Sequence, residues 1–464
     1  MASNLEVVIM AAGKGTRMKS SLPKVLHPVA GKPMVCHVID TARQLQARQT
    51  VVITGHGAEQ VEAALTASYG SDGLQFARQM PQLGTGHAVQ QAAPHLTDEA
   101  TVVVLSGDVP LTQADTLQAL IAASGGDKLA LLTIEFADPT GYGRIVRDAA
   151  GLVQAIVEQK DASDEQRRIR EVYSGIMAVP ARLLKPWLAK LDNHNAQQEF
   201  YLTDVVKFAV ADGVPVVAHV IADAAQVAGV NSLAQLAELE RIHQRRRAEA
   251  FMADGVRIID PARFDVRGEL VCAQDVQIDV NCIFEGCVQL GQGVKIGANC
   301  VLANCTIEAG AVIHPFTHID GEKLGVTVGE GALIGPFARL RPGARLGAEV
   351  HIGNFVEVKN STMAKGAKAN HLAYLGDATV GERVNYGAGS ITANYDGANK
   401  HRTVIEADVH IGSNCVLVAP VTIGAGGTVG GGSTITKSTE PGALSVARGK
   451  QISIAHYKRP VKKK

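Results

Sequence analysis

Residues 10–24 of this 464-residue chain combine glycines with cations at a spacing that suits phosphate binding. The stretch reads Met10-Ala11-Ala12-Gly13-Lys14-Gly15-Thr16-Arg17-Met18, and Leu22-Pro23-Lys24 follows it. Glycines let backbone N–H groups turn toward an anion, and the two lysines and the arginine place positive charge beside them. A strand-ending turn with solvated basic residues would have the same composition. The stretch therefore allows two interpretations, a phosphate-binding loop or an ordinary turn.

Two common phosphate-binding motifs do not match this stretch. A P-loop needs a glycine five positions before the glycine of Gly-Lys-Ser/Thr, but Val8 holds that place and Gly15 follows Lys14. A dinucleotide-binding fingerprint needs a third glycine where this chain has Met18. If the stretch binds phosphate, it does so as a loop of another type.

Asp108 is the carboxylate that the sequence places best to hold a metal ion. It follows the apolar run 101–105 and the pair Ser106-Gly107, and it precedes Val109-Pro110. Mg²⁺ takes a few carboxylate oxygens from the protein and fills its other positions with substrate phosphates and water. A turn-forming aspartate would fit the same context, but a phosphate-binding loop at the same sheet edge favours the metal.

Residues 79–87 read Gln-Met-Pro-Gln-Leu-Gly-Thr-Gly-His. The glycines around Thr85 expose backbone groups, and each glutamine offers a donor and an acceptor side by side. Such an amide matches the edge of a base such as uracil. We expect this segment to read a base, with a surface turn as the alternative.

Arg341, Lys359 and His371 are the most informative chemical group of the second half. Two cations beside a histidine suit a phosphate-bearing substrate with a proton to lose. Acetyl transfer to an amine needs a neutral nitrogen, and histidine changes its protonation near neutral pH, so it can accept that proton. A histidine in a regular repeat is more often structural, which is the competing interpretation.

The segments that would position the candidate residues of the first half alternate between strand and helix. Apolar runs at 7–10, 51–53 and 101–105 predict buried strands, and the spacing over 33–45 and 61–65 predicts helices. This rhythm indicates a mostly parallel sheet with helices on both faces. Ligands of such sheets bind beyond the carboxyl ends of the strands. The opening loop and Asp108 both lie at such ends.

The second half is a repeat that begins after a predicted linker helix. The helix starts after the capping pair Asn231-Ser232 and ends at Gly255. Beyond it, aliphatic residues recur every six positions, in the series Leu290, Ile296, Leu302; Val328, Ile334, Leu340, Leu346, Ile352, Val358; and Ile405, Ile411, Leu417, Ile423, Val429, Ile435. This period predicts a β-helix solenoid with the aliphatic side chains stacked inside. Interruptions at 367–374 and 391–403 predict two functional loops. An uncapped solenoid with a basic tail, Lys458–Lys464, would fit packing against other copies.

Composition excludes several classes of protein. The formal net charge is zero and the pI is about 7.2, which disfavours a nucleic-acid or membrane-surface partner. Seven cysteines without a Cys-x-x-Cys pair indicate reduced thiols rather than a disulfide framework or zinc site. The first apolar run is too short for a signal peptide, and no stretch approaches the roughly 20 apolar residues of a membrane span. We expect a cytoplasmic protein.

The motifs together resemble one family of sugar-nucleotide enzymes. After the opening loop come Gln-Leu-Gly-Thr-Gly-His from 82, Gly-Asp-Val-Pro-Leu from 107, Asp-Pro-Thr-Gly-Tyr-Gly-Arg-Ile from 138, Val-Glu-Gln-Lys-Asp-Ala from 157 and Gly-Val-Asn from 229. These are similar to the uridylyltransferase half of the bifunctional enzymes that make UDP-N-acetylglucosamine. Motifs starting at 335, 353, 368 and 394 resemble the glucosamine-1-phosphate N-acetyltransferase half. The resemblance covers nearly the whole chain.

The resemblance implies an architecture and a reaction sequence. It implies an α/β protein with a Rossmann-like uridylyltransferase domain over 1–233, a linker helix over 234–254 and a left-handed parallel β-helix N-acetyltransferase domain over 255–464. Acetyl-CoA would acetylate glucosamine-1-phosphate in the β-helix. UTP would then react with the product in the first domain, releasing pyrophosphate. The family implies Mg²⁺ as cofactor and a homotrimer in which neighbouring solenoids share the acetyl site.

The resemblance also implies roles for individual residues. The nucleotide phosphates, the uracil and the sugar would contact Met10, Ala11, Ala12, Gly13, Arg17, Lys24, Gln79, Gly84, Thr85, Ser106, Gly107, Asp108, Gly143, Glu158, Tyr173 and Asn231, with Arg17 and Lys24 catalytic and Asp108 and Asn231 binding the metal. His371 would be the general base of acetyl transfer. Glucosamine phosphate would contact Arg341, Lys359, Tyr374 and Asn385. Acetyl-CoA would contact Ala388, Asn394, Tyr395, Ser413, Gly431 and Arg448.

Two positions depart from the family pattern. Tyr173 stands where asparagine is usual, which replaces a carboxamide by a phenol of different reach, and Gly431 stands where alanine is common. Two alternatives compete with the two-activity enzyme: a nucleotidyltransferase whose solenoid only regulates or oligomerises, and a non-catalytic sugar-nucleotide sensor. The group of Arg341, Lys359 and His371 disfavours the first, because a scaffold has no use for them.

Overall fold

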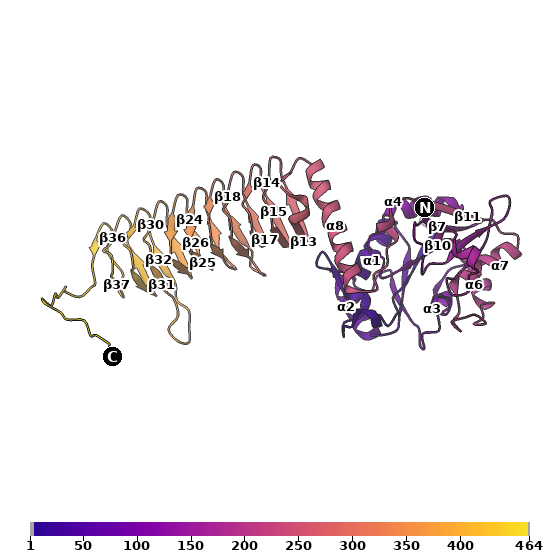
Figure 1. Ribbon diagram of the computed structural model, residues 1–464. Helices are drawn as coiled ribbons and strands as arrows, with labels where there is room; N and C mark the ends of the chain where they lie inside the picture. Colours follow the sequence, from indigo (N-terminus) through magenta and orange to yellow (C-terminus); the bar gives the residue numbers. More distant parts are fainter. Residues whose placement is uncertain (1–3, 463–464) are drawn as a thin grey trace. The chain divides into compact units, whose positions relative to one another are not determined.

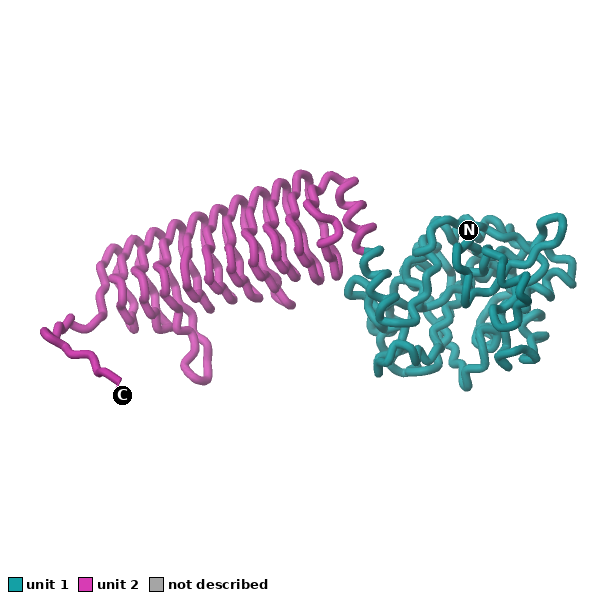
Figure 2. The backbone as a smooth tube through the Cα atoms, in the orientation of Figure 1, with its two compact units in different colours: residues 1–243 teal, residues 244–464 magenta. Residues whose placement is uncertain are grey.

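In the computed structural model, which describes residues 4–462, the chain divides into two compact units, residues 1–243 and 244–464 (Figure 2). Across the described residues, no helix combines the length and the apolar composition that crossing a bilayer requires. The two units have unrelated architectures.

A twisted sheet organises the first unit (Figure 1). Its main strands, in spatial order, are β11 (Val216–Ile221), β7 (Leu129–Glu135), β10 (Glu171–Pro180), β6 (Thr101–Ser106), β1 (Leu5–Met10), β4 (Gln49–Thr54) and β5 (Leu74–Arg78). All pairs are parallel except those of β10, which runs antiparallel to β6 and β7. A hairpin of β8 (Arg144–Arg147) and β9 (Val153–Val157) extends the sheet from β10, and β2 (Pro28–Val29) pairs with β3 (Lys32–Pro33).

Helices cover both faces of this sheet because its central strands are apolar on both sides. Val8 packs with one set of helices, α3 (Thr85–Ala92), α6 (Ala181–Ala189) and α7 (Val205–Ala211). Val7 packs with the other set, α1 (Met34–Gln44), α2 (Ala58–Tyr69) and α4 (Ala114–Ser124). A short helix, α5 (Asp164–Arg167), lies between β9 and β10. The predicted α/β architecture is confirmed, and the predicted strands and helices of this half are all present.

The second unit is a parallel β-helix with three sides. The first side contains β12 (Arg257–Ile258), β14 (Gln277–Ile278), β16 (Lys295–Ile296), β18 (Val312–Ile313), β21 (Leu333–Ile334), β24 (His351–Asn354), β27 (Lys368–His371), β30 (Asn385–Tyr386), β33 (His410–Ile411), β36 (Thr428–Val429) and β38 (Leu444–Ser445). The second side contains β19 (His318–Asp320), β22 (Arg339–Leu340), β25 (Glu357–Lys359), β28 (Tyr374–Gly376), β31 (Ile391–Ala393), β34 (Val416–Val418) and β37 (Thr434–Ile435). The third contains β20 (Val326–Val328), β23 (Arg345–Leu346), β26 (Thr362–Met363), β29 (Ala378–Val380), β32 (Thr403–Ile405) and β35 (Val421–Ile423). Three long strands, β13 (Phe264–Cys272), β15 (Cys282–Leu290) and β17 (Val301–Ile307), run over the second and third sides.

The hexapeptide residues build the core of this solenoid. Every member of the three predicted series is buried and belongs to one continuous cluster. One of the two predicted interruptions is wrong: residues 367–374 do not form a loop but continue the coils as β27 and β28. The aliphatic pattern fades there because Ala367, Ala369 and Ala373 fill the inward positions. The other prediction is confirmed, since the segment after β31 projects from the solenoid before β32 begins (Figure 1).

Helix α8 (Leu233–Ala253) contributes to both cores. Leu239 packs in the first unit with Met18, and Glu240 accepts a hydrogen bond of 2.6 Å from the Ala30 N–H. In the second unit, Ala248 is fully buried in the solenoid core, and Phe251 and Met252 pack against it. The expectation of an uncapped solenoid is therefore wrong at its N-terminal end, which the last turns of this helix cover.

Candidate functional site

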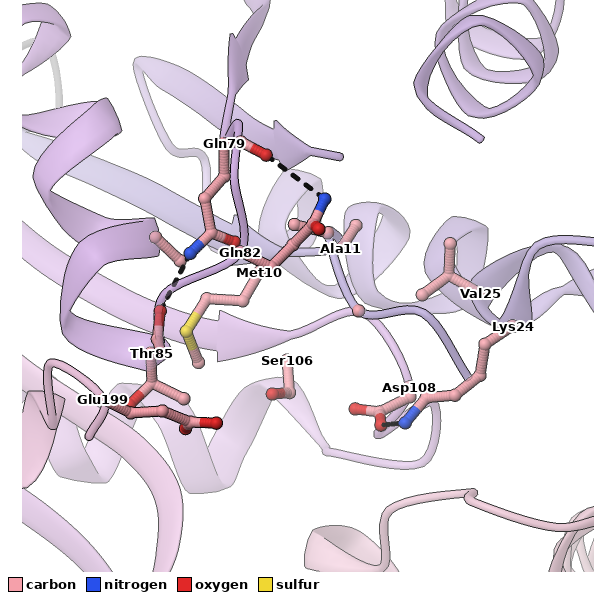
Figure 3. Close-up of a pocket in the computed structure, with 14 residues that line it drawn as sticks. Met10, Ala11, Lys24, Val25, Gln79, Gln82, Thr85, Ser106, Asp108 and Glu199 are labelled. Carbon is pink, nitrogen blue, oxygen red and sulfur yellow. Dashed lines mark hydrogen bonds and ion pairs between the residues drawn. The ribbon is translucent and has the colours of Figure 1, made fainter. Parts of the chain in front are cut away.

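A cavity of about 280 Å³ lies at the carboxyl edge of the first sheet (Figure 3). Its lining comes from the ends of β1 and β6 with the residues that follow them, the short turn 24–26, the start of α3 with the segment before it, and the loop after α6. The lining residues are Met10, Ala11, Ala12, Gly13, Lys24, Val25, Gln79, Gln82, Gly84, Thr85, Ala88, Ser106, Asp108 and Glu199. Ten of these fourteen residues belong to the predicted nucleotide site. The cavity lies where the strand pattern placed a ligand.

Strand register brings the ends of three strands to this cavity. Met10 pairs with Ile53 on β4 and with Ser106 on β6. The Gly107 N–H donates a hydrogen bond of 2.9 Å to the Met10 carbonyl, and the Ala11 N–H donates one of 2.8 Å to Ile53. The glycine-rich loop and the segment that carries Asp108 therefore leave the sheet side by side.

Lys24, Asp108 and Asn231 meet beside the cavity although they lie far apart in the sequence. The Lys24 ammonium pairs with an Asp108 carboxylate oxygen (Figure 3). It also donates a hydrogen bond of 3.0 Å to the Asn231 side-chain oxygen. The Val230 N–H donates to the Asp108 carbonyl at 3.0 Å, which fixes Asn231 next to that aspartate. Both members of the ion pair are mostly buried, so their attraction is less screened than that of a surface pair.

Gly15 allows the loop to approach Lys24. Its φ is +59°, and a Cβ at this position would lie 2.6 Å from the Cβ of Lys24. Only glycine fits both the backbone conformation and the contact. Arg17, by contrast, is exposed on the following turn and does not line the cavity.

Gln79 is held rigidly at the opposite end of the cavity from Lys24. It is 3% exposed, and its amide nitrogen lies 2.9 Å from the Gly84 carbonyl and 3.3 Å from His87 Nδ1. These contacts use the amide donors and leave the side-chain oxygen able to accept a hydrogen bond. Gly84 is required because a Cβ there would lie 2.6 Å from the Phe200 carbonyl oxygen.

Gly143, Glu158 and Tyr173 form a second group outside the lining of this cavity. The Tyr173 N–H donates to the Gly143 carbonyl at 2.9 Å, and Thr203 donates to the Glu158 carboxylate at 3.1 Å. Burial raises the pKa of the Glu158 carboxyl above its ordinary value. Burial also raises the pKa of the Tyr173 phenol, and the nearby Glu158 charge adds to the effect. The buried Tyr173 hydroxyl has no hydrogen-bond partner within residues 4–462.

The first unit offers a divalent cation few ligands of its own. Among the described residues, no group of three or more histidine, cysteine, aspartate or glutamate side chains could enclose a metal. Asp108 and Asn231 nevertheless place two oxygens together, held in common by Lys24. This donor set fits Mg²⁺, which binds through one or two protein oxygens and takes the rest from substrate phosphates and water.

Arg341, Lys359 and Tyr374 project from consecutive coils on the second side of the solenoid. Arg341 donates a hydrogen bond of 2.8 Å to Glu357, and that carboxylate raises the pKa of the Arg341 guanidinium. Contact with Lys400 and then burial lower the pKa of the Lys359 ammonium. The result is a cationic surface whose positive charge is only partly balanced.

His371 lies at the end of β27, next to this surface. Its Nδ1 lies 3.0 Å from the side-chain oxygen of Asn354, which the register places opposite it on β24. An amide oxygen can only accept a hydrogen bond, so Nδ1 carries the proton and Nε2 keeps its lone pair. The exposed ring can therefore act as a base through Nε2.

The predicted acetyl-CoA residues fall into two sets. The first set is Ala388, Ser413 and Gly431, which lie one above another on successive coils at the corner between the first and second sides. Backbone hydrogen bonds connect these coils, starting from His371: the Gly389 N–H donates to the His371 carbonyl, that of Asn414 to Ala388 and that of Gly432 to Ser413. Gly431 adjoins Ser413, and Arg448 donates to the Gly431 carbonyl at 2.8 Å. Asn394 and Tyr395 instead follow β31, at the next corner, and Asn385 begins β30 on the first side. One chain does not bring these sets together.

An exposed apolar ladder occupies the same corner just before the acetyl-CoA set. Its members are Phe316, Phe337, Phe355 and Leu372, each with a positive φ and between 46% and 62% exposed. The three phenylalanine rings stack with centroids 5.0 and 5.3 Å apart. Other coils place Asn281, Asn299 or Asn414 at this left-handed position, the residue type that tolerates it better. We call these four residues the corner ladder.

Sequence reasoning missed part of the first site. Glu199 lines the cavity from a loop that carries no recognisable motif, and Val25 and Ala88 contribute only apolar surface. Gln82 was visible as one of the two glutamines before α3. The only signal for Glu199 is tertiary, because the close contact of Gly84 with Phe200 brings that loop to the cavity.

Comparisons with known proteins agree with the two units. Residues 7–176 match the family model of the MobA-like NTP transferase domain, and residues 325–360 and 402–437 match that of the bacterial transferase hexapeptide (six repeats). The chain is 74% identical to "Bifunctional protein GlmU" of Albidiferax ferrireducens over 99% of its length and 100% of the relative's. It is 72% identical to the Acidovorax sp. (strain JS42) protein of that name, covering 99% and 98% of the two chains.

A more distant relative gives the same result. "Bifunctional protein GlmU" of Azoarcus sp. (strain BH72) is 59% identical, over 99% of this chain and all of the relative. Full-length identity to bifunctional proteins removes the alternatives of a single-activity enzyme and of a non-catalytic sensor. The chain therefore belongs to the GlmU family of bifunctional enzymes, and it carries a uridylyltransferase and a glucosamine-1-phosphate N-acetyltransferase activity.

Proposed function

We propose that the cavity at the edge of the first sheet binds UTP and that uridylyl transfer takes place beside Lys24. The observation that carries the proposal is the convergence of Lys24, Asp108 and Asn231 on one side of a cavity whose other end holds Gln79. The loop 10–13 would hold the phosphates inside the cavity, and Arg17, which lies outside the lining, would reach them from the following turn. Gln79, Gly84 and Thr85 would read uracil, with the Gln79 side-chain oxygen accepting from the ring N–H.

The sugar phosphate would approach from the second group, Gly143, Glu158 and Tyr173, with Ser106 and Gly107 lining the path. Its phosphate oxygen attacks the α-phosphorus of UTP, the bond to the β-phosphate breaks, and pyrophosphate leaves. This oxygen is already anionic, so no strong base is needed. Positioning and neutralisation of phosphate charge by Lys24 and Arg17 supply the catalysis.

The first site takes a divalent cation, and we propose Mg²⁺ held by Asp108 and Asn231. Held there, the ion would supply positive charge to offset that of the triphosphate. Lys24 contacts both of these side chains, so it would hold them in place for the ion and supply further positive charge beside the phosphates.

In the second unit, we propose that His371 Nε2 accepts a proton from the substrate amine. The amine nitrogen then bonds to the acetyl carbonyl carbon, and the thiolate of coenzyme A leaves. Arg341 and Lys359 would bind the phosphate, and Tyr374 and Asn385 the sugar. Ala388, Asn394, Tyr395, Ser413, Gly431 and Arg448 would bind acetyl-CoA.

We further propose that the chain works as a homotrimer. The two sets of acetyl-CoA residues lie at different corners of one solenoid, so a groove that uses both needs a corner from a second copy. The corner ladder supports this arrangement because it exposes stacked aromatic rings in a conformation that costs about 1 kcal/mol per residue. The solenoid of a second copy of the chain would cover these rings.

Two assays on the purified full chain test the proposal. One measures thiol release from acetyl-CoA with glucosamine-1-phosphate, and the other measures pyrophosphate release from UTP with the acetylated product. We expect His371→Ala to abolish only the first and Asp108→Ala only the second. Unchanged acetylation in the His371 variant would refute the second site, and full Mg²⁺-dependent turnover in the Asp108 variant would refute the metal assignment.

A further inference from the structure

Arg144 is a buried guanidinium with no carboxylate in ion-pair contact among the described residues, although the charges of Asp138 and Glu158 act on it from farther away. It begins β8 and is 1% exposed. Within residues 4–462 it forms no ion pair, and its Nε has no hydrogen-bond partner. Burying an unpaired charge costs several kcal/mol, and an apolar residue of similar volume usually packs at least as well. Packing alone therefore does not explain an arginine at this position.

The donors of Arg144 connect three separate segments. One terminal nitrogen donates to the Tyr142 carbonyl in the loop 138–143. The other donates to the Gln159 side-chain oxygen at 2.6 Å and to the Arg167 carbonyl of α5 at 3.5 Å. Gln159 also accepts from the Gly141 N–H at 3.4 Å, which ties the same loop a second time.

Two of these segments carry residues of the sugar-binding group. Gly143 ends the loop that Arg144 holds through Tyr142, and Glu158 directly precedes Gln159. The two residues are tightly packed, since a Cβ on Gly143 would lie 2.7 Å from Ile156 and 3.6 Å from the Glu158 carboxylate. A shift of either segment therefore changes the space between Gly143 and Glu158.

The neighbouring arginine on the same strand behaves differently. Arg147 is partly exposed and makes paired contacts of 2.8 and 2.7 Å with the Glu171 carboxylate. It is an ordinary strand-to-strand ion pair. Arg144 instead directs its charge at backbone carbonyls and an amide, a use for which only the planar, multi-donor guanidinium is suited.

We propose that Arg144 is a positioning residue of the uridylyltransferase, which holds the loop 138–143, the turn after β9 and α5 at the spacing that the sugar phosphate requires. The proposal rests on the proposed sugar site at Gly143 and Glu158. It assigns Arg144 no contact with the substrate. Replacing Arg144 should weaken binding of the sugar phosphate and leave binding of UTP unchanged.

The test compares Arg144→Met, Arg144→Lys and Gln159→Ala in the full chain, with Arg147→Met as the matched control. We expect Arg144→Met to raise the KM for N-acetylglucosamine-1-phosphate by about 10- to 100-fold, the range that small misplacement of a site produces. The KM for UTP, the acetyltransferase rate and the unfolding midpoint should stay near those of the unchanged chain. Arg144→Lys should restore part of the loss, Gln159→Ala should give a smaller rise, and Arg147→Met should change neither KM.

Other outcomes would overturn the proposal. Equal increases in both KM values, or a loss that follows a lower unfolding midpoint, would make Arg144 a structural residue only. Unchanged kinetics in all variants would show that the segments hold their spacing without it. If Arg144→Met does not fold, Arg144→Lys and Gln159→Ala decide the question by the same two KM values. Absence of uridylyl transfer in the unchanged chain would instead refute the proposed function itself.

Discussion

The imidazole of His371 and the amide of Asn354 form a hydrogen-bonded pair across adjacent coils, with 3.0 Å between Nδ1 and the amide oxygen. Because this contact fixes both the tautomer and the direction of the ring, Asn354 should matter for acetyl transfer without touching the substrate. The register of β24 and β27 makes the pair a property of the fold rather than of a mobile loop.

Asn354→Ala should lower kcat/KM for acetyl transfer by about 10-fold, against about 10²- to 10⁴-fold for His371→Ala. The ring would lose its fixed tautomer but keep its basic nitrogen. Thiol release from acetyl-CoA measures both effects. An unchanged rate would show that the contact has no role in catalysis. Uridylyl transfer serves as the internal control.

Asp108→Asn should reduce uridylyl transfer by about 100-fold at saturating substrates, the cost typical of losing one charge-stabilising group. It removes the negative charge but keeps the shape of the side chain. Titration of pyrophosphate release with Mg²⁺ should show a weakened metal dependence. Asp98→Asn, at a surface ion pair with Lys185, is a suitable control and should behave like the unchanged chain. A normal Mg²⁺ titration in Asp108→Asn would contradict the assignment.

Glu158→Gln should stabilise the first unit at neutral pH and weaken its activity. Burial raises the pKa of this carboxyl above 4.5, so the folded state binds the proton more tightly than the unfolded chain does. The contribution of Glu158 to stability is therefore most favourable below pH 4.5 and declines as the pH rises through the raised folded pKa. Thermal unfolding of the full chain across this range should show a higher midpoint for Glu158→Gln at pH 7.

The difference between Glu158→Gln and the unchanged chain should disappear in acid, where the carboxyl is neutral in both states. The KM for the sugar phosphate should rise by about 10-fold, a loss of about 1.4 kcal/mol of binding. A midpoint that falls at pH 7 would mean that the charged carboxylate is stabilised by its surroundings. In that case burial would not disfavour the charged form of Glu158.

Replacing Phe337 and Phe355 together by asparagine should dissociate the assembly and leave each solenoid folded. Asparagine tolerates the left-handed backbone, and Asn299 and Asn414 already hold the equivalent corner in other coils. Light scattering should report the mass of one chain, and acetylation should fall by at least about 10-fold while uridylyl transfer remains. Leu324→Asn removes a comparably exposed apolar side chain outside the corner ladder and should leave the mass unchanged. An unchanged mass in the double variant would place the contact between copies elsewhere.

Sequence patterns predicted the parts of the fold whose periodicity is local. The apolar strands around Val8 and Val103 and the inward hexapeptide residues are all buried, because alternation and repeat length report burial directly. The prediction of an interruption at 367–374 was wrong because alanines, which the aliphatic pattern does not count, fill the inward positions of that coil. The pattern reports side-chain size there and not the path of the chain.

The candidate sites divide in the same way. The strand ends that carry Met10 and Asp108 follow from sheet topology alone, so sequence could place them together. The approach of Asn231 to Asp108 and that of Glu199 to the cavity depend on contacts between distant segments, which no local pattern records. The capping of the solenoid by Ala248 was missed for the same reason, since a polar-looking helix gives no sign that one small residue is buried.

Ala248 is fully buried, and Gln244 exchanges hydrogen bonds of 2.9 and 2.8 Å with Val266. These contacts determine where a truncated protein that contains only the β-helix should begin. A fragment that starts at Gly255 would leave the first coil with an open apolar end and unpaired strand edges, which template aggregation. A fragment that starts at or before Gln244 would keep the helical turns that cover the first coil. Work on the acetyltransferase in isolation should therefore begin inside the helix, not after it.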